Sequence, residues 1–286
     1  MTFKEIVTVL PQYLLPHHLL SQWLSKLTHC ENRLWKNFFI RTIIKVYGVN
    51  MSEAKQPDIN AYKNFNQFFT RELQAGARPL TAEAEAIASP ADGVISQAGA
   101  ITEGRIFQAK DHSYTVEELL GGNSDRAKPF VNGSFATIYL SPKDYHRLHM
   151  PLSGTLTEMV HIPGRLFSVN GTTVNNVPNL FARNERVACI FDSEAGPVAL
   201  ILVGAIFVSS VETVWHGVVT PPSCKEPRSW QYSVDAPQLA KGAEMGRFNM
   251  GSTIIVLFAE NKATWNDDLQ AGKAVRLGEK LGHWQF

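Results

Sequence analysis

The sequence predicts an α+β protein in which N-terminal amphipathic helices are followed by a β-rich body. In the first 75 residues, apolar side chains recur at spacings of three and four, which is the pattern of one helix face. From about residue 86, short β-branched runs are separated by glycine and proline, which is typical of strands and turns. The chain has 286 residues, of which 44% are hydrophobic, so it is large enough for a substantial core. We therefore divide it into a helical region, residues 1–75, and a β-rich domain, residues 76–286.

The composition excludes several classes of protein. A formal net charge of +1 is too small for the uniformly basic surface of a non-specific nucleic-acid-binding protein. The three cysteines are widely spaced and form no C-x-x-C motif, so neither a disulfide framework nor a metal site is predicted. The longest apolar run, Val198–Val208, is shorter than the roughly 18 residues of a membrane-spanning helix, and the N-terminus lacks the features of a signal peptide.

The first predicted element is a helix over residues 19–27, and Pro11 and Pro16 are expected to break the segment before it. A second helix is predicted over Asn32–Tyr47, which is rich in aromatic residues and carries four basic side chains and no acid. A linker over residues 50–60 leads to a further helical patch at residues 62–69.

The role of these helices has two interpretations. They pack on the body of the protein or on a second copy of the chain, or they lie in a membrane interface, where tryptophan, phenylalanine and basic residues are favoured. Residues 1–50 contain six Lys or Arg against two Glu, and each cation near an anionic leaflet contributes about 1 kcal/mol.

The second half of the pattern predicts strands. A strand, a turn at Asp92-Gly93 and a second strand are expected over residues 87–96. Further expected strands are residues 135–140, 155–162, a hairpin of Arg186–Asp192 with Val198–Val208, and Ile254–Phe258. The second hairpin strand is apolar throughout, so we expect it to be buried on both faces.

Three places carry residues that are suited to chemistry. Asp92 has an ordinary interpretation as a turn residue, and His146 and His149 are either a surface pair or two metal ligands on one helical face. Ser252 follows Gly251 directly before a predicted buried strand, without the G-x-S-x-G pattern of an α/β-hydrolase. Together these residues supply an acid, a base and a hydroxyl for base-activated nucleophilic chemistry.

Five short motifs then occur in order along the chain. They are Ser-Pro-Ala-Asp-Gly at 89–93, Asp-Tyr-His-Arg-Leu-His-Met-Pro at 144–151, Ile-Pro-Gly-Arg-Leu-Phe-Ser-Val-Asn at 162–170, Glu-Thr-Val-Trp at 212–215 and Met-Gly-Ser-Thr at 250–253. This set resembles the pyruvoyl-dependent phosphatidylserine decarboxylases from about Tyr62 onwards, and the basic N-terminal helices are similar to the bacterial, membrane-associated form. Met250 stands where the family usually has leucine, a change of similar volume.

The resemblance implies that the chain cuts itself between Gly251 and Ser252. The Ser252 hydroxyl would attack the carbonyl of Gly251, with His149 taking its proton and Asp92 orienting the imidazole. Elimination would then leave a pyruvoyl group, the covalent cofactor, at the former Ser252. The products would be a large chain, 1–251, and a small chain, 252–286, which stay together as a heterodimer and could pair into a dimer of such units.

The same resemblance implies the reaction and its location. The amine of phosphatidylserine would form a Schiff base with the pyruvoyl group, carbon dioxide would leave, and His146, titrating near neutral pH, would return a proton to give phosphatidylethanolamine. Arg165 is a candidate for the lipid phosphate or carboxylate, or else forms a surface ion pair. The implied place is the cytoplasmic side of the cell membrane, where residues 1–75 associate peripherally with the anionic surface and residues 76–286 form the catalytic domain.

Two rival functions belong to other classes. One is a serine hydrolase that uses Asp92, His149 and Ser252 on an external ester, and the other is a non-catalytic β-rich module that docks on membranes. Both rivals predict a chain that stays intact.

Overall fold

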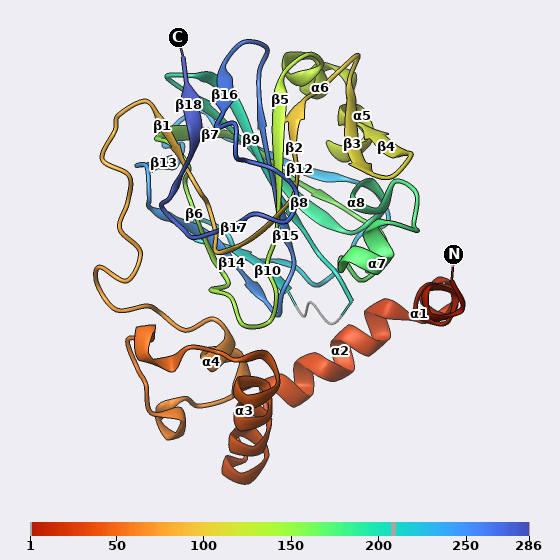
Figure 1. The fold of residues 1–286 in the computed structure, drawn as a ribbon, viewed down its shortest axis with the longest axis vertical. Helices are drawn as coiled ribbons and strands as arrows, with labels where there is room; N and C mark the ends of the chain where they lie inside the picture. The colour runs from red at the N-terminus through yellow and green to blue at the C-terminus, as the bar shows by residue number, and fades with distance from the viewer. Residues whose placement is uncertain (1, 207–209, 286) are drawn as a thin grey trace.

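The computed structural model describes residues 2–206 and 210–285, and it confirms the order of helices followed by a β-rich body (Figure 1). The N-terminal elements lie at the end of the molecule away from the C-terminus. They are α1 (Phe3–Leu14), α2 (His17–Thr28), α3 (Arg33–Tyr47), the 3₁₀ turns η1 (Met51–Glu53) and η2 (Ile59–Ala61), and α4 (Phe65–Phe69).

Local capping explains where α3 begins and ends. The side chain of Asn32 accepts hydrogen bonds from the backbone amides of Leu34 and Trp35, and Gly48 ends the helix in the left-handed region at φ 69°. The predicted helix over Asn32–Tyr47 is therefore confirmed.

The prediction that Pro11 breaks its segment is wrong, because α1 continues through it and the Pro11 carbonyl accepts a bond from the amide of Leu15. A capping box formed by Thr2 and Glu5 stabilises the first turn of this helix. Pro16 does separate two helices, since it stands at the N-cap of α2.

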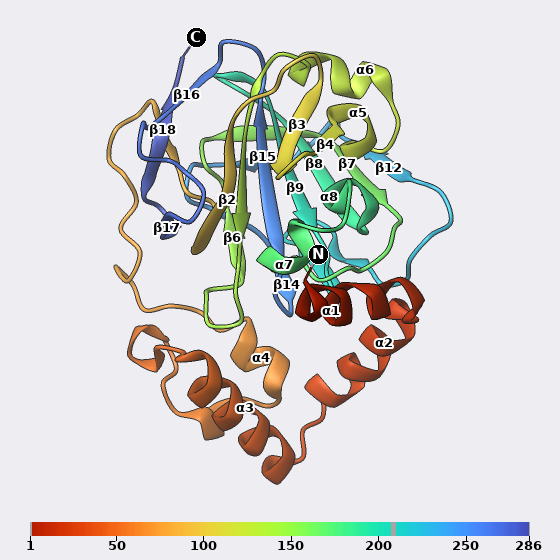
Figure 2. The same cartoon turned by 45° about the vertical axis from the view of Figure 1, so that its right-hand side comes forward.

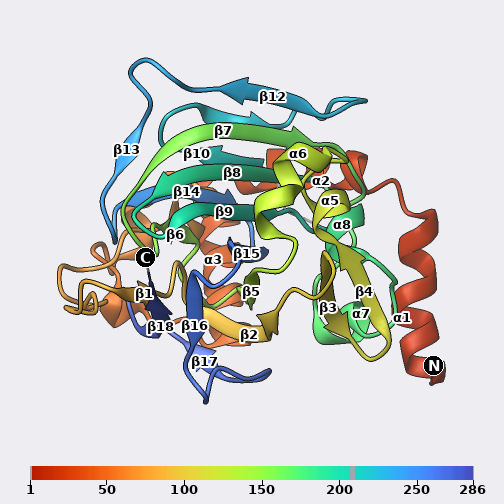
Figure 3. The ribbon, with the colours of Figure 1, turned by 90° about the horizontal axis from the view of Figure 1, so that it is seen from above.

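The largest sheet is antiparallel and forms the centre of the body. Figure 3 shows its strands β7, β8 and β9 as neighbouring curved arrows. In spatial order its strands are β12 (Arg228–Gln231), β7 (Gly154–Ile162), β8 (Arg186–Ser193), β9 (Gly196–Val203), β15 (Thr253–Phe258), β5 (Ser134–Tyr139), β2 (Gly93–Ala100) and β17 (Ala274–Val275), with β13 (Gln238–Leu239) also paired to β7.

Smaller sheets and short helices complete the body. One sheet has the order β11 (Gly217–Thr220), β10 (Ser210–Thr213), β14 (Glu244–Asn249) and β6 (Arg147–His149), and another has the order β1 (Ala86–Ala88), β18 (Lys280–Trp284) and β16 (Ala263–Trp265). The remaining elements are the hairpin of β3 (Arg105–Ala109) with β4 (His112–Thr115), α5 (Val116–Leu119), α6 (Ser124–Ala127), η3 (Lys128–Phe130), α7 (Gly171–Val174) and α8 (Leu180–Arg183).

The prediction of a hairpin over residues 87–96 is wrong. β1 pairs with β18, whereas β2 pairs with β5 and β17, so Asp92 and Gly93 lie where the chain passes from one sheet to another. Gly93 is required there for a different reason, because a Cβ at this position would clash with the backbone carbonyl of Tyr139. Asp92 is therefore placed at a junction between sheets instead of at an exposed turn.

The other predicted strands form close to the expected residues. β8 and β9 form the predicted hairpin, and β9 is buried from Val198 to Val203. The strand ends at Val203, so the prediction that it continues through residues 204–206 is wrong, and residues 207–209 lie outside the described residues. β15 lies between β9 and β5, where Ile254 pairs with Leu202 on one side and Ile138 on the other, and all of its residues are buried. The segment directly after Ser252 is thus a core strand.

The first helix is docked on the body by specific contacts (Figure 2). The Gln12 side chain donates to Thr173 Oγ1 at 3.3 Å and accepts from the Ser168 amide at 2.8 Å. Arg165 donates to the carbonyl of Tyr13 at 2.7 Å. Because carbonyls at a helix C-terminus lack partners within the helix, Arg165 stabilises the end of α1.

Candidate active site

Ser252 lies between β14 and β15 in a fully buried position. Its carbonyl accepts a hydrogen bond from the Leu140 amide at 2.8 Å, which fixes the backbone at the start of the core strand. Its side-chain Oγ is also buried, and within the described part of the chain it has no hydrogen-bond partner. A buried hydroxyl without a partner costs free energy, and such a cost is tolerated most often at functional sites.

The backbone before Ser252 is strained. Met250 has a φ of 87°, which is unfavourable for any residue with a Cβ and costs of order 1 kcal/mol or more. Gly251 follows it and lines an apolar cavity. The peptide bond between Gly251 and Ser252 is therefore held in a tight, strained turn at the edge of a cavity.

His146 is the imidazole that the structure places beside this turn. A Cβ built on Gly251 would lie 3.2 Å from the Cε1 atom of His146. The ring is fully buried and stacks on Phe69 with ring centroids 4.0 Å apart. Its Nε2 donates to the carbonyl of Ser141 at 3.1 Å, and its buried Nδ1 has no hydrogen-bond partner among residues 2–206 and 210–285.

This position corrects two expectations about the histidines. His146 and His149 lie on and beside strand β6, so they share no helical face, and His146 is not a surface residue. Burial, together with the positive charge of Arg71, lowers the pKa of His146 from 6.5 to about 3. The expectation that it titrates near neutral pH is wrong for this buried ring, which is neutral at pH 7.

The low pKa of His146 predicts a loss of stability in acid. The unfolded chain takes up a proton on this imidazole below pH 6.5, whereas the folded chain excludes it down to about pH 3, so stability is lost as the pH falls through this window. Between about pH 7 and pH 5, we expect the free energy of unfolding to fall by about 2 kcal/mol more in an uncleaved Ser252→Ala chain than in the same chain carrying His146→Asn. Urea unfolding at both pH values measures this, and equal losses would contradict it.

His149 has a different environment from that of His146. Its Nδ1 donates to the carbonyl of Gly242 at 2.8 Å, so in the neutral ring Nε2 is the accepting nitrogen, and the Tyr145 hydroxyl lies 3.3 Å from it. Burial lowers its pKa, so the neutral form is favoured. The side chain borders a polar cavity of about 400 Å³ that Arg147 and Lys241 also line. A neutral imidazole with a fixed tautomer is suited to act as a base.

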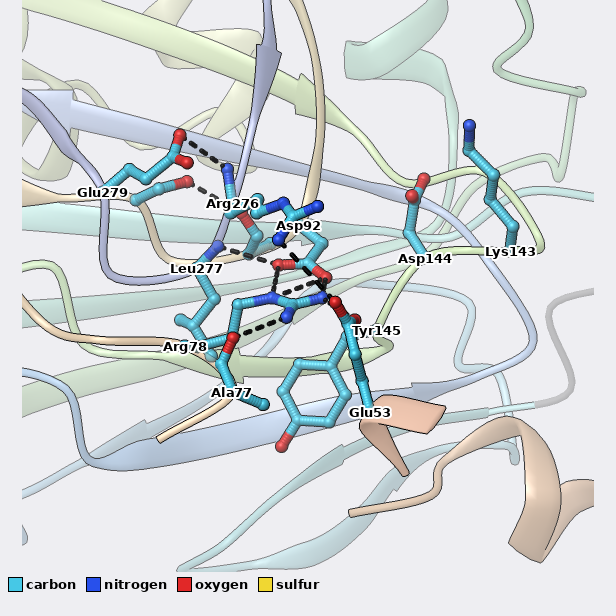
Figure 4. Close-up of polar contacts among 12 residues, drawn as sticks. Glu53, Ala77, Arg78, Asp92, Lys143, Asp144, Tyr145, Arg276, Leu277 and Glu279 are labelled. Carbon is cyan, nitrogen blue, oxygen red and sulfur yellow. Dashed lines mark hydrogen bonds and ion pairs between the residues drawn. The ribbon is translucent and has the colours of Figure 1, made fainter. Parts of the chain in front are cut away.

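Asp92 is engaged by an arginine (Figure 4). Arg78 Nε donates to Asp92 Oδ1 at 2.8 Å, Arg78 Nη2 donates to Asp92 Oδ2 at 2.6 Å, and the Leu277 amide donates to Oδ1 at 2.8 Å. The same guanidinium donates to Glu53 at 2.8 Å, which joins the segment after α3 to the catalytic body. These fork-like bonds fix the Asp92 carboxylate in one orientation.

No hydrogen bond joins any two of Asp92, His149 and Ser252 in the described ranges. Asp92 and His149 are neighbours through the backbone, since the His149 amide donates to the carbonyl of Pro90 at 2.9 Å. The structure thus brings His146 to Gly251 and Asp92 close to the strand of His149. The catalytic roles of these residues stay predictions.

An apolar cavity of about 290 Å³ opens onto Gly251. Its lining comes from two sources, the helical region and the body, and includes Ile43, Tyr47, Phe65, Phe69, Tyr139, Val169 and Met250. Sequence reasoning identified the aromatic patch at residues 62–69 as a helix but missed that it forms a wall of the site. The available signal was the number of phenylalanines in this patch, since a short helix needs fewer of them to pack against the core.

Arg165 does not line this cavity, and its guanidinium is used at the end of α1, so the suggestion that it meets the lipid headgroup has no support from its position. Over the part of the chain that the structure covers, no group of three His, Cys, Asp or Glu side chains is arranged to hold a metal ion.

Fold and site together define a β-rich enzyme with a buried serine at a strained turn, a histidine beside it and an apolar cavity. A family profile described as "Phosphatidylserine decarboxylase" matches residues 65–283, and one described as "PSD" matches residues 7–48. The "Phosphatidylserine decarboxylase proenzyme" of Ectopseudomonas mendocina (strain ymp) is 57% identical over 286 residues, which cover 99% of this chain and 100% of the relative. The protein of the same name from Pseudomonas fluorescens strain Pf-5 is 58% identical over 282 residues, or 98% of each chain.

The chain therefore belongs to the phosphatidylserine decarboxylase family, as its five motifs indicated.

Proposed function

We propose that this protein cleaves its own chain between Gly251 and Ser252 and then converts phosphatidylserine into phosphatidylethanolamine and carbon dioxide. The observation that carries the proposal is the buried Ser252 hydroxyl, without a hydrogen-bond partner in the described residues, at a strained turn that opens onto an apolar cavity. The similarity to relatives named as proenzymes supports it. Neither an external ester hydrolase nor a non-catalytic module is favoured by these relatives.

The self-cleavage needs atoms of the turn, a base and one water molecule. Ser252 Oγ attacks the carbonyl carbon of Gly251, loses its proton to the base, and forms an ester while the amide nitrogen is released as an amine. A base then removes the Cα proton of Ser252, the bond between Cβ and Oγ breaks, and Gly251 leaves as a carboxylate. Water replaces the nitrogen, which departs as ammonia, so the small chain begins with a pyruvoyl group.

His149 is the base in this proposal, with Asp92 as its electrostatic partner. The hydrogen bond from Nδ1 to Gly242 leaves Nε2 as the basic nitrogen. Burial lowers the pKa of the ring, and the bond to Gly242 and the negative charge of Asp92 oppose part of that lowering. Asp92 is fixed by Arg78 at the junction between sheets, so its distance from His149 is set by rigid elements.

The surroundings of Ser252 fit a pyruvoyl group, since Gly251 directly before it lines an apolar cavity. The Cα atom of Ser252 would become the keto carbon of the group and the Cβ atom its methyl carbon. When present, the group supplies an electron-withdrawing carbonyl that reacts with an amine and accepts the electrons released with carbon dioxide. In this proposal His146 returns a proton to the substrate carbon. The Nε2–H of the neutral ring is bonded to Ser141, so the free Nδ1 beside Gly251 would first take up a proton that the substrate's ammonium group releases and then pass it to the carbon.

The two chains of the mature protein should stay associated. The small chain would begin at residue 252, directly before β15, and this strand is hydrogen-bonded on both sides to strands of the large chain. Removing it would expose its buried apolar side chains to water, at a cost of roughly 1.5 to 3 kcal/mol for each large one. We therefore propose a heterodimer that forms without dissociation.

We propose that the helical region holds the protein against the cytoplasmic face of the cell membrane. Large apolar side chains of α1, α2 and α3 are exposed, among them Phe3, Leu10, Leu14, Leu19, Trp23, Leu34, Phe38 and Val46. Basic side chains accompany them, which suits an anionic lipid surface. Within the described residues, no helix has the length and apolar character to cross a bilayer.

Two exposed leucines test this membrane contact. Leu14 and Leu34 are 85% and 83% exposed, so Leu14→Glu combined with Leu34→Glu should leave the unfolding temperature unchanged. We expect the double variant to bind anionic vesicles at least about tenfold more weakly in co-sedimentation, since two apolar anchors are replaced by charges. Val234→Glu is the matched control, because Val234 is 85% exposed on the body. Equal binding by the double variant and the control would contradict the assignment.

Intact mass spectrometry and an assay of carbon dioxide test the function itself. The proposal predicts two chains, residues 1–251 and residues 252–286, the smaller with a blocked N-terminus. It also predicts that purified protein releases carbon dioxide from phosphatidylserine. A single intact chain that is active on phosphatidylserine, or a cleaved chain without this activity, would contradict it.

A further inference from the structure

Arg71 is a buried arginine whose hydrogen-bonding capacity is largely unused. The residue follows α4 and is only 4% exposed, with its guanidinium over the ring of Phe68 at 5.5 Å. Its Nη2 donates to the carbonyl of Lys143 at 3.3 Å, whereas Nε and Nη1 are buried and have no hydrogen-bond partner among the described residues. Another buried arginine, Arg186, shows the usual outcome, since its Nε, Nη1 and Nη2 all donate to backbone carbonyls.

The carboxylates around Arg71 are already committed to other donors. Figure 4 shows Asp92 and Glu53 gathered around Arg78, which donates to both. Asp144 accepts from the amide and the hydroxyl of Ser141, each at 2.7 Å. Arg71 is therefore a positive charge in a cavity wall whose acids are neutralised or hydrogen-bonded elsewhere. A buried cation in this condition is suited to receive an anion from outside the chain.

Arg71 lies between two parts of the site. It lines a cavity of about 310 Å³ together with Arg78, Asp92 and Tyr145. It is also close enough to His146 for its charge to lower the pKa of that ring, and His146 lies against Gly251. A molecule whose amine reaches the former Ser252 from the apolar cavity would thus have an anionic group within the field of Arg71.

We propose that Arg71 binds the oxyanion of the lipid headgroup and so determines which headgroups enter the site. This inference rests on the proposed function. An arginine presents two parallel N–H groups that match the oxygens of a phosphate or a carboxylate. The phosphate is the more productive partner, because an arginine on the carboxylate would stabilise the charge that must be lost with carbon dioxide. The phosphate is also retained in the product.

Ligand binding to an uncleaved chain tests the proposal without relying on activity. The full-length Ser252→Ala protein, with and without Arg71→Gln, is titrated with short-chain phosphatidylserine and with short-chain phosphatidylethanolamine below their micelle concentrations. We expect Arg71→Gln to raise the Kd by at least about tenfold, which corresponds to about 1.4 kcal/mol. A rise for both lipids identifies the phosphate as the bound group, and a rise for phosphatidylserine alone identifies the carboxylate. An unchanged Kd for both lipids overturns the proposal.

Two further variants separate binding from folding. Arg71→Lys keeps the charge with fewer donors, so it should restore part of the affinity, and it decides by the same criterion if Arg71→Gln does not fold. Arg186→Lys is the matched control, which should lower stability and leave the Kd unchanged. A Kd that rises equally in Arg186→Lys also overturns the proposal.

In cleaved protein, Arg71→Gln should raise KM with a smaller effect on kcat, because a group bound equally in substrate and transition state contributes to KM. Failure of the proposed function would instead appear as an intact or inactive wild-type chain. The Kd values are measured on the uncleaved Ser252→Ala chain, so they test the role of Arg71 separately from that failure.

Discussion

Replacing Ser252 with alanine should leave the full-length chain uncleaved and reduce decarboxylation by at least about a thousandfold. The hydroxyl is both the nucleophile that attacks Gly251 and the oxygen that leaves with Gly251 in the elimination, so no neighbouring group replaces it. Because Oγ is buried without a hydrogen-bond partner in the described residues, the substitution should not lower the unfolding temperature. Intact mass spectrometry, a carbon dioxide assay and a thermal melt measure the three effects.

Ser134→Ala is the matched control for this prediction. Ser134 Oγ is likewise buried and lacks a hydrogen-bond partner in the described ranges, but it lies at the far end of β5 from Tyr139, the residue that pairs with Thr253. The control should cleave and decarboxylate as the wild type does. Cleavage of the Ser252→Ala chain between residues 251 and 252 would refute the assigned nucleophile.

Replacing His146 with alanine should reduce decarboxylation by about a hundredfold or more while the chain still cleaves. The ring lies against Gly251 and has an unbonded Nδ1, so it is placed to take up a proton from the substrate's ammonium group and return it to the substrate carbon. His149→Ala should remain one chain, and without the pyruvoyl group it should release no carbon dioxide either. His283→Ala serves as the control, because His283 is exposed and pairs with Glu83 away from the site.

The pair of histidine variants also decides between two bases. The structure places His146, and not His149, in contact range of the turn before Ser252. If His146→Ala stays uncleaved and His149→Ala cleaves, His146 is the base of the self-cleavage and the roles proposed above are reversed. Chain mass measures cleavage in every variant, whereas carbon dioxide release measures decarboxylation only in variants that have cleaved. A residue is therefore assigned to cleavage by the first readout, and to decarboxylation by the second readout in a cleaved chain.

Elements with strong local signals were predictable from the sequence. The α3 helix begins at an asparagine cap and ends at a left-handed glycine, and both signals act within a few residues. The burial of β9 and β15 follows from their uninterrupted apolar side chains. A strand with one face in water would instead alternate apolar and polar side chains. The position of Ser252 directly before a core strand was predictable for the same reason.

Long-range pairing was not predictable in this way. The pattern of residues 86–100 predicts two strands, but no signal in the neighbouring sequence indicates that β1 pairs with β18 near the end of the chain. The bond from the Leu277 amide to Asp92 spans 185 positions, and the stacking of Phe69 on His146 joins two segments with separate local patterns. Arg71 gave no signal either, because its unusual state arises from what its neighbours are bonded to.

The central place of β15 limits how the reactive group is supplied. Under the proposed function, that group is the first residue of this strand's own chain, and it cannot be exchanged with a pool in solution as a dissociable cofactor can. Each polypeptide makes it once, and a molecule that loses it through a side reaction is permanently inactive. The amount of active enzyme then depends on the rate of protein synthesis and on how long the covalently attached group survives. No metabolite added from outside restores an enzyme molecule that has lost this group.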